Sequence, residues 1–115
     1  MTNQRIPAKT REVFEHLKIC ASQMRTVTYK EIADEFHLAK PGVGRPLGYI
    51  RDTICRARGL PWLSAIVVNR HTDRPGRSFI PEGTTVLSEV DKELLWRGMV
   101  LQVFAYNWTN VDFDE

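Results

Sequence analysis

The sequence predicts a single, mainly α-helical domain of about four helices with one small β-hairpin. Two observations carry this prediction. Apolar side chains recur three and four residues apart over several stretches, which is the spacing of one helix face. A β-branched run at 63–68 is followed by turn-forming residues at 69–76 and a short apolar run at 78–80, which indicates the two strands of a hairpin.

The whole-chain composition is that of a soluble globular protein. The chain has 115 residues, 43% of them hydrophobic and 26% charged, which suits one domain with one modest core. No apolar run approaches the roughly 18 residues of a membrane helix. The amino-terminal residues carry no hydrophobic block, so we expect no signal peptide and a cytoplasmic protein. Cys20 and Cys55 are then expected to be reduced, buried thiols.

A first helix is expected over 10–24, after a flexible end at 1–9. Its apolar stripe consists of Val13, Leu17, Cys20 and Met24, widened by Phe14. We expect this helix to support the two helices that follow it.

The chain is organised around residues 28–58. Thr28 and Glu31 form a capping-box pattern, which starts a short helix, and the sequence Lys40-Pro41-Gly42 ends it. A second helix is expected over 43–58, where the apolar stripe is Val43, Leu47, Ile50 and Ile54.

This second helix should begin near Gly44 or Arg45, because Pro46 is tolerated only in a first turn, and it should end at Gly59. Its outward face then carries Arg45, Tyr49, Asp52 and Arg56. Two short helices joined by a tight turn are a helix-turn-helix, whose second helix meets DNA with its outward face.

Basic residues concentrate in the middle of the chain. Residues 40–77 contain eight basic and two acidic residues, a net charge of +6, and the rest of the chain carries −4. The tip of the expected hairpin, 69–77, holds Arg70, His71, Arg74 and Arg77. Helix, turn, helix and hairpin form the winged-helix order, and a basic wing suits contacts to DNA phosphates.

A last helix is expected over 89–106, capped by Ser88. It is apolar on more than one side, so it can cover the core and also leave a surface over 89–113 for a protein partner. We expect the acidic end, 109–115, to be flexible.

Two segments resemble the DNA-binding domain of O6-alkylguanine-DNA alkyltransferases and alkyltransferase-like proteins. Val27-Thr28-Tyr29-Lys30-Glu31-Ile32-Ala33 is similar to the family's V-x-T/S-Y-G-x-I-A segment, and Gly42-Val43-Gly44-Arg45-Pro46-Leu47-Gly48 to its G-x-x-R-x-V-G segment. The resemblance implies a winged helix in which Arg45 enters the duplex in place of a flipped base. It also implies that Tyr29 pushes on the phosphate of the rotated nucleotide.

The chain departs from that family at the chemical centre. Where the family has P-C-H-R-V, this sequence places Ala65 at the acceptor cysteine, with Ile66 and Val67 at the histidine and arginine. Alkyl transfer needs a thiolate beside a base. We therefore expect a non-catalytic DNA-binding protein that takes no alkyl group from DNA.

Other chemistry finds little support in the sequence. His16, His37 and His71 do not have zinc-ligand spacing, and Gly42-Val43-Gly44 lacks the lysine and serine of a phosphate loop. We expect no metal and no cofactor. Two alternatives to DNA binding stay open: a small interaction or anti-defence module of a phage or mobile element, and an enzyme whose site needs a partner. The expected DNA-binding residues are Thr28, Tyr29, Gly44, Arg45, Tyr49, Arg51, Arg56, Arg70, His71, Arg74 and Arg77.

Overall fold

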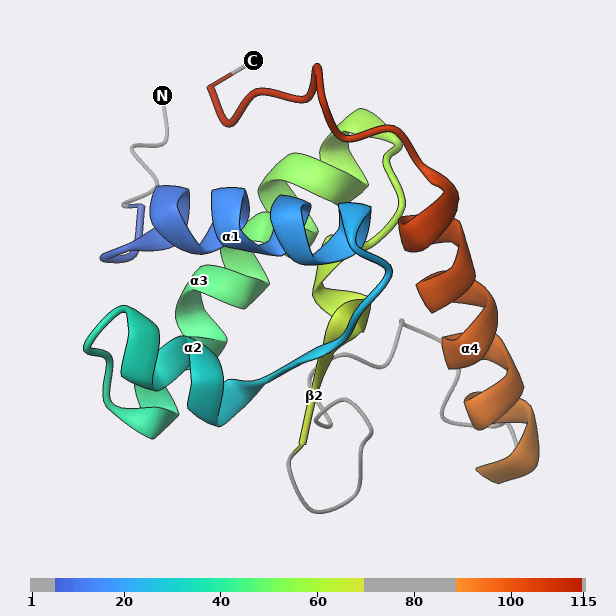
Figure 1. Cartoon of the computed structure of the whole chain (residues 1–115), viewed down its shortest axis with the longest axis horizontal. Helices are drawn as coiled ribbons and strands as arrows, with labels where there is room; N and C mark the ends of the chain where they lie inside the picture. The colour runs from blue at the N-terminus through green and yellow to red at the C-terminus, as the bar shows by residue number, and fades with distance from the viewer. Residues whose placement is uncertain (1–5, 70–88, 115) are drawn as a thin grey trace.

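The structure is a computed structural model that describes residues 6–69 and 89–114 (Figure 1). The described part is mainly helical, as the sequence predicts, and it also contains a small two-stranded sheet. The expected returning strand at 78–80 and the helix cap Ser88 lie outside the described residues. The elements in chain order are α1 (Thr10–Ser22), β1 (Val27–Thr28), α2 (Tyr29–Glu35), η1 (Lys40–Val43), α3 (Gly44–Tyr49), η2 (Ile50–Arg56), η3 (Leu63–Ile66), β2 (Val67–Val68) and α4 (Glu89–Ala105).

Helix α1 begins at Thr10, whose hydroxyl donates a hydrogen bond to the Pro7 carbonyl oxygen at 2.6 Å. Its apolar stripe is buried as predicted, except at its end. Met24 was expected to complete the stripe, which is wrong: α1 ends at Ser22, and Met24 lies in the following turn with φ 55° and 69% exposure. The turn toward β1 directs this side chain into solvent.

The first helix of the pair starts where the sequence predicts. The Thr28 hydroxyl accepts a hydrogen bond from the Glu31 amide at 3.1 Å, so one of the free amides of the first turn of α2 is satisfied. After Glu35 the chain turns through η1, a 3-10 helix with Pro41 in its first turn. This short connection delivers the backbone directly into α3.

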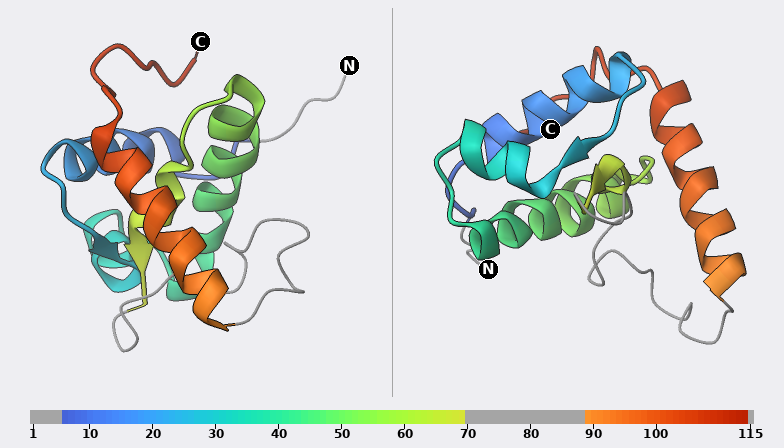
Figure 2. Two further views of the ribbon diagram at one scale, coloured as in Figure 1. Left: turned by 90° about the vertical axis from the view of Figure 1, so that its right-hand side faces the viewer. Right: turned by 60° about the horizontal axis from the view of Figure 1, so that its bottom comes forward.

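The second helix of the pair is built from two kinds of helix. Helix α3 begins at Gly44 and continues into η2, which is a π-helix. The helical segment ends at Gly59, whose φ is 68°. The two form one continuous rod, which we call the α3–η2 rod (Figure 2, right). Its predicted stripe is confirmed as buried: Val43, Leu47, Ile50 and Ile54, joined by Cys55.

The prediction of a strand over 63–68 is correct only for the last two residues. Leu63–Ile66 form the 3-10 helix η3, and Val67–Val68 alone form β2. β2 pairs in parallel with β1, Val27 opposite Val67 and Thr28 opposite Val68, and not with a following strand among the described residues. A continuous apolar run is buried in either conformation, so its composition did not distinguish helix from strand.

Helix α4 packs across η3 at one side of the molecule (Figures 1 and 2). Val100 and Val103 are buried in the core, and the Trp96 indole Nε1 donates to the Ala65 carbonyl oxygen at 2.8 Å. One face of α4 therefore covers the core, as the sequence indicates.

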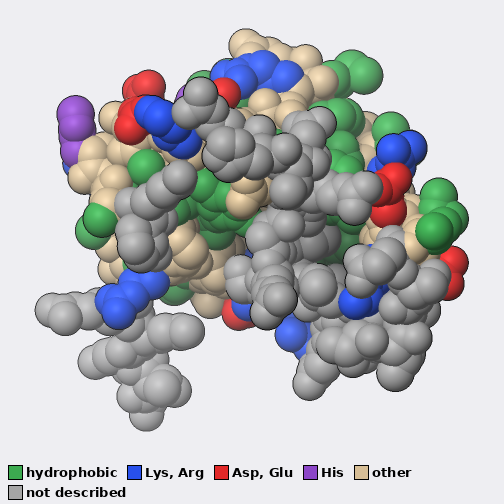
Figure 3. All heavy atoms as spheres, turned by 90° about the horizontal axis from the view of Figure 1, so that it is seen from below, with side chains coloured by type: hydrophobic (Ala, Val, Ile, Leu, Met, Phe, Trp, Pro, Cys, Tyr) green, Lys and Arg blue, Asp and Glu red, His purple; other side chains and the backbone are tan. Residues whose placement is uncertain are grey.

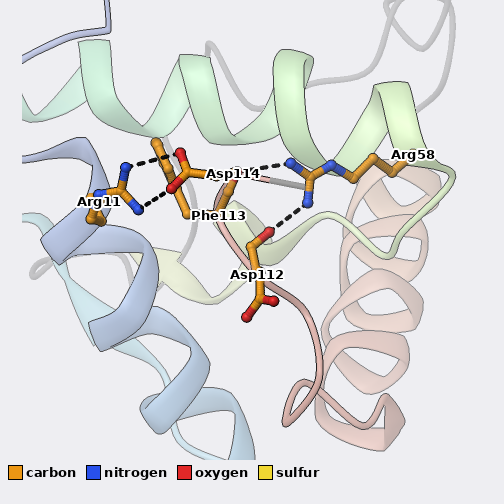
Figure 4. A network of polar contacts seen from close by, with 5 residues as sticks. All are labelled: Arg11, Arg58, Asp112, Phe113 and Asp114. Carbon is orange, nitrogen blue, oxygen red and sulfur yellow. Dashed lines mark hydrogen bonds and ion pairs between the residues drawn. The ribbon is translucent and has the colours of Figure 1, made fainter.

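Residues 109–114 pack on the domain, which differs from the expectation of a flexible end at 109–115; Glu115 lies outside the described residues. Val111 and Phe113 are buried, and the Arg58 guanidinium donates to the carbonyl oxygens of Asp112 and Phe113 at 2.6 and 2.8 Å (Figure 4). Arg11 donates two hydrogen bonds to the Asp114 carboxylate at 2.7 and 2.9 Å. We call residues 109–114 the strap, because it joins α1 to the end of the α3–η2 rod.

Phe113 is the main apolar contact of the strap, and its loss should destabilise the whole fold. Its ring lies 5.7 Å from the Phe14 ring and 6.0 Å from the Tyr49 ring. Phe113→Ala should lower the free energy of unfolding by about 3 kcal/mol, the usual cost of a buried phenylalanine. Chemical denaturation measures this change.

Asp112→Ala is the matched control, because the side chain of Asp112 is exposed and Arg58 contacts its backbone carbonyl. That variant should stay within about 0.5 kcal/mol of the parent. If Phe113→Ala behaves like the control, the strap does not pack on the domain.

Candidate nucleic-acid interface

The outward face of the α3–η2 rod carries an open hollow of about 240 Å³. Its wall is formed mainly by residues that recur on one face of the rod, with one proline from the amino-terminal segment. The lining residues are Pro7, Gly44, Arg45, Gly48, Tyr49, Asp52 and Thr53. This face is opposite in character to the buried stripe that faces α1.

Gly44 and Gly48 leave this space open beside the backbone. A Cβ atom placed on either glycine would have no neighbouring atom within 4 Å among residues 6–69 and 89–114. The internal packing of the domain therefore does not require glycine at either position. A glycine inside a helix destabilises it by about 1 kcal/mol relative to alanine. The two glycines weaken the rod, and what they provide is access to its backbone.

Arg45 lies between the two glycines at the start of the rod. Its side chain is exposed and makes no hydrogen bond or ion pair within residues 6–69 and 89–114. A guanidinium group offers five N–H donors in one plane. Arg45 can therefore donate to a molecule that enters the hollow without first leaving a partner in the described part of the chain.

Tyr49 forms a wall of the hollow and is held by the strap. It is half-buried, and its ring stacks on Phe113 with an interplanar angle of 21°. The strap therefore positions a side chain of the outward face, a contact that joins the carboxy-terminal segment to the α3–η2 rod.

Arg51 and Asp52 form an ion pair beside the hollow. The Arg51 guanidinium donates to the two Asp52 carboxylate oxygens at 2.8 and 3.0 Å. This hydrogen bonding lowers the pKa of Asp52 below its ordinary value, so the carboxylate stays ionised at neutral pH. Of the two, Asp52 lines the hollow and Arg51 does not. The positive charge expected at Arg51 is thus largely offset by its neighbour.

The other expected DNA contacts fall outside the hollow. Thr28 and Tyr29 lie at the start of α2, and Arg56 is exposed at the end of η2. The expected wing residues lie outside the described residues: Arg70, His71, Arg74 and Arg77. The face seen in Figure 3 shows the described basic side chains in separate groups, some beside acidic ones.

Four residues of the hollow were not among the expected DNA contacts: Pro7, Gly48, Asp52 and Thr53, of which Asp52 was expected only to lie on the outward face. Gly48 follows Gly44 by one helical turn, so the spacing of the two glycines could have indicated it. Thr53 follows Tyr49 by the same interval. Pro7 comes from a distant segment, and no local pattern points to it.

The two cysteines are free and buried. Burial raises the pKa of both thiols, and for Cys55 to about 11. A thiol with a raised pKa is a poor nucleophile at neutral pH because little thiolate is present. Ala65, at the position of the family's acceptor cysteine, is itself fully buried in η3.

Neither a metal site nor a membrane-spanning helix is found among the described residues. Among residues 6–69 and 89–114, no three His, Cys, Asp or Glu side chains are grouped so as to hold a metal ion. The His16 ring instead packs edge-on against Phe36, with ring centroids 5.6 Å apart. None of the described helices combines the length and the apolar character needed to cross a bilayer.

Comparison of the chain with protein-family models, with curated proteins and with solved structures gave no match.

The raised pKa of Cys55 predicts a loss of stability at alkaline pH. The folded state holds the thiol proton more tightly than the unfolded state, whose thiol has a pKa near 9.0. The resulting stabilisation is complete below pH 9.0 and is lost as the pH rises to about 11. Denaturation curves across this range should show a decrease that is smaller in Cys55→Ala, where only the buried Cys20 thiol remains. Equal pH dependence of the two proteins would contradict the assignment.

Proposed function

We propose that this protein binds double-stranded DNA without catalysing a reaction on it, with the α3–η2 rod as a recognition helix. The observation that carries the proposal is the hollow around Arg45, formed by two helical glycines that the fold itself does not need. Glycine at two successive turns leaves the helix backbone uncovered, so another molecule can approach the helix closely. An exposed arginine at the start of that helix suits the edge of a guanine base.

The geometry of the helix pair supports this reading. In a helix-turn-helix the second helix enters the major groove, and its amino-terminal residues meet the base edges. Arg45 and the two glycines occupy the first turns of the rod. The buried stripe holds the rod against α1, so the outward face is fixed in direction before any partner binds.

Arg45 and Asp52 differ in what they can recognise. Arginine can donate two hydrogen bonds to O6 and N7 of guanine, and a carboxylate can accept one from N4 of cytosine. Both side chains line the hollow. We infer a preference for G·C pairs over A·T pairs at the bases that this face meets.

The winged-helix architecture is part of the same proposal. The basic segment 69–77 would act as the wing and would contact phosphates, adding affinity with little sequence preference. The absence of catalysis is proposed from the burial of the thiols and from alanine at position 65. The alternative of a protein-interaction module is favoured by the exposed apolar side chains of α4.

Arg45→Ala should weaken duplex binding by roughly 5- to 150-fold, the range of a bidentate arginine–guanine contact of about 1–3 kcal/mol. Arg45→Lys should not restore the affinity, because lysine lacks the planar pair of donors. Fluorescence anisotropy with a G·C-containing duplex at fixed salt measures both. Circular dichroism should show unchanged folding, since the side chain is exposed.

Arg25→Ala is the matched control, because Arg25 is an exposed arginine that does not line the hollow. Its loss should reduce affinity only slightly, through one net charge. Equal losses for Arg25→Ala and Arg45→Ala would mean that the protein binds DNA by charge alone. Undiminished binding by Arg45→Ala would rule out this face as the DNA contact.

A further inference from the structure

Helix α4 carries an apolar stripe on the face that points away from the core. Val90, Leu94 and Leu101 are 69%, 61% and 66% exposed. Gly98 and Ala105 are exposed on the same face, at spacings that keep all five positions on one side of a helix. We call these five residues the outer stripe.

The outer stripe takes no part in the hydrophobic core that the described residues form. The opposite face of α4 supplies the core contacts, namely Trp96, Val100 and Val103. Figures 1 and 2 show α4 at the edge of the molecule, and apolar side chains lie along the corresponding right-hand rim in Figure 3. Exposed aliphatic side chains in a continuous row, with charged residues beside them, mark an interaction surface.

The stripe is symmetric about its own centre. Leu94 and Leu101 lie equally far from the midpoint between Arg97 and Gly98, and so do Val90 and Ala105. Two copies of this helix packed antiparallel about a two-fold axis at that midpoint would place leucine against leucine. A surface that matches itself in this way is what an isologous dimer requires.

We propose that a second copy of this chain docks on α4, with the two α4 helices antiparallel. Gly98 then lies at the crossing point, and a Cβ atom there would have no neighbour within 4 Å in the part of the single chain that the structure describes. Its missing side chain lets the two helix axes approach closely. The proposal does not depend on the proposed DNA binding.

The charges beside the stripe permit this arrangement. Arg97 comes near its own copy at the axis, but it already pairs with Glu93 at 3.0 Å within each chain. Two neutral pairs therefore meet, and not two bare positive charges.

The small size of the contact predicts a weak association. One pair of helices of 17 residues each stays near or below the roughly 1,000 Å² that separates stable from transient interfaces. The dimer should therefore be weak and dependent on concentration. Dimerisation would also present two helix pairs to a partner with two-fold symmetry.

Sedimentation equilibrium of the full chain over a range of concentrations tests the proposal. The parent protein should shift from monomer to dimer as the concentration rises. Leu94→Glu and Leu101→Lys should each remain monomeric, since each places charges in the contact between the two α4 helices. An equal mixture of the two variants should form a heterodimer, because Leu94 of one copy faces Leu101 of the other.

Gly98→Gln is the variant that separates association from folding. Glutamine favours the helix more than glycine, so the melting temperature should not fall, while the added side chain should block the close crossing and abolish the dimer. A parent protein that stays monomeric at every concentration would overturn the proposal. Dimers of Leu94→Glu would also overturn it. A sharp fall in the melting temperature of monomeric Leu94→Glu would do the same, because it would mean that this face is covered within the chain.

Discussion

The burial of one face of the α3–η2 rod against α1 is the constraint on which the rest of the structure depends. The rod must pack against the apolar stripe of α1 if its own apolar side chains are to be buried, namely Leu47, Ile50 and Ile54. Once that face is buried, the direction of the opposite face follows from helix geometry. The position of Arg45 and of the two glycines beside the hollow is therefore a consequence of core packing.

The helices could be predicted because each has a periodic apolar stripe and an identifiable start. Thr28 and Pro46 fixed the starts of α2 and α3 to within a residue, since a cap and a proline act locally. The 3-10 form of 63–66 could not be predicted, because burial and not local preference selects the conformation of a run that is apolar apart from Ser64. The packing of the strap could not be predicted either, because the residues that hold it, Arg11 and Arg58, are distant from it in sequence.

The candidate site was predicted in part. Arg45, Tyr49 and Gly44 share a face that periodicity alone defines, and the structure places all three at the hollow. The pairing of Arg51 with Asp52, which offsets the positive charge, depends on the side-chain rotamers of both residues, and the sequence does not give these. The contribution of Pro7, and the stacking of Tyr49 on Phe113, arise only when the ends of the chain meet the rod.

The central claim is that Gly44 and Gly48 serve an outside molecule and not the fold. The most direct measurement compares melting temperature and duplex affinity for the parent, Gly48→Ala and Gly48→Gln. The account predicts that both variants gain up to about 1 kcal/mol in unfolding free energy, because each favours the helix and meets open space. It also predicts that DNA affinity falls from parent to alanine to glutamine as the hollow fills. Higher stability with undiminished DNA affinity would contradict it.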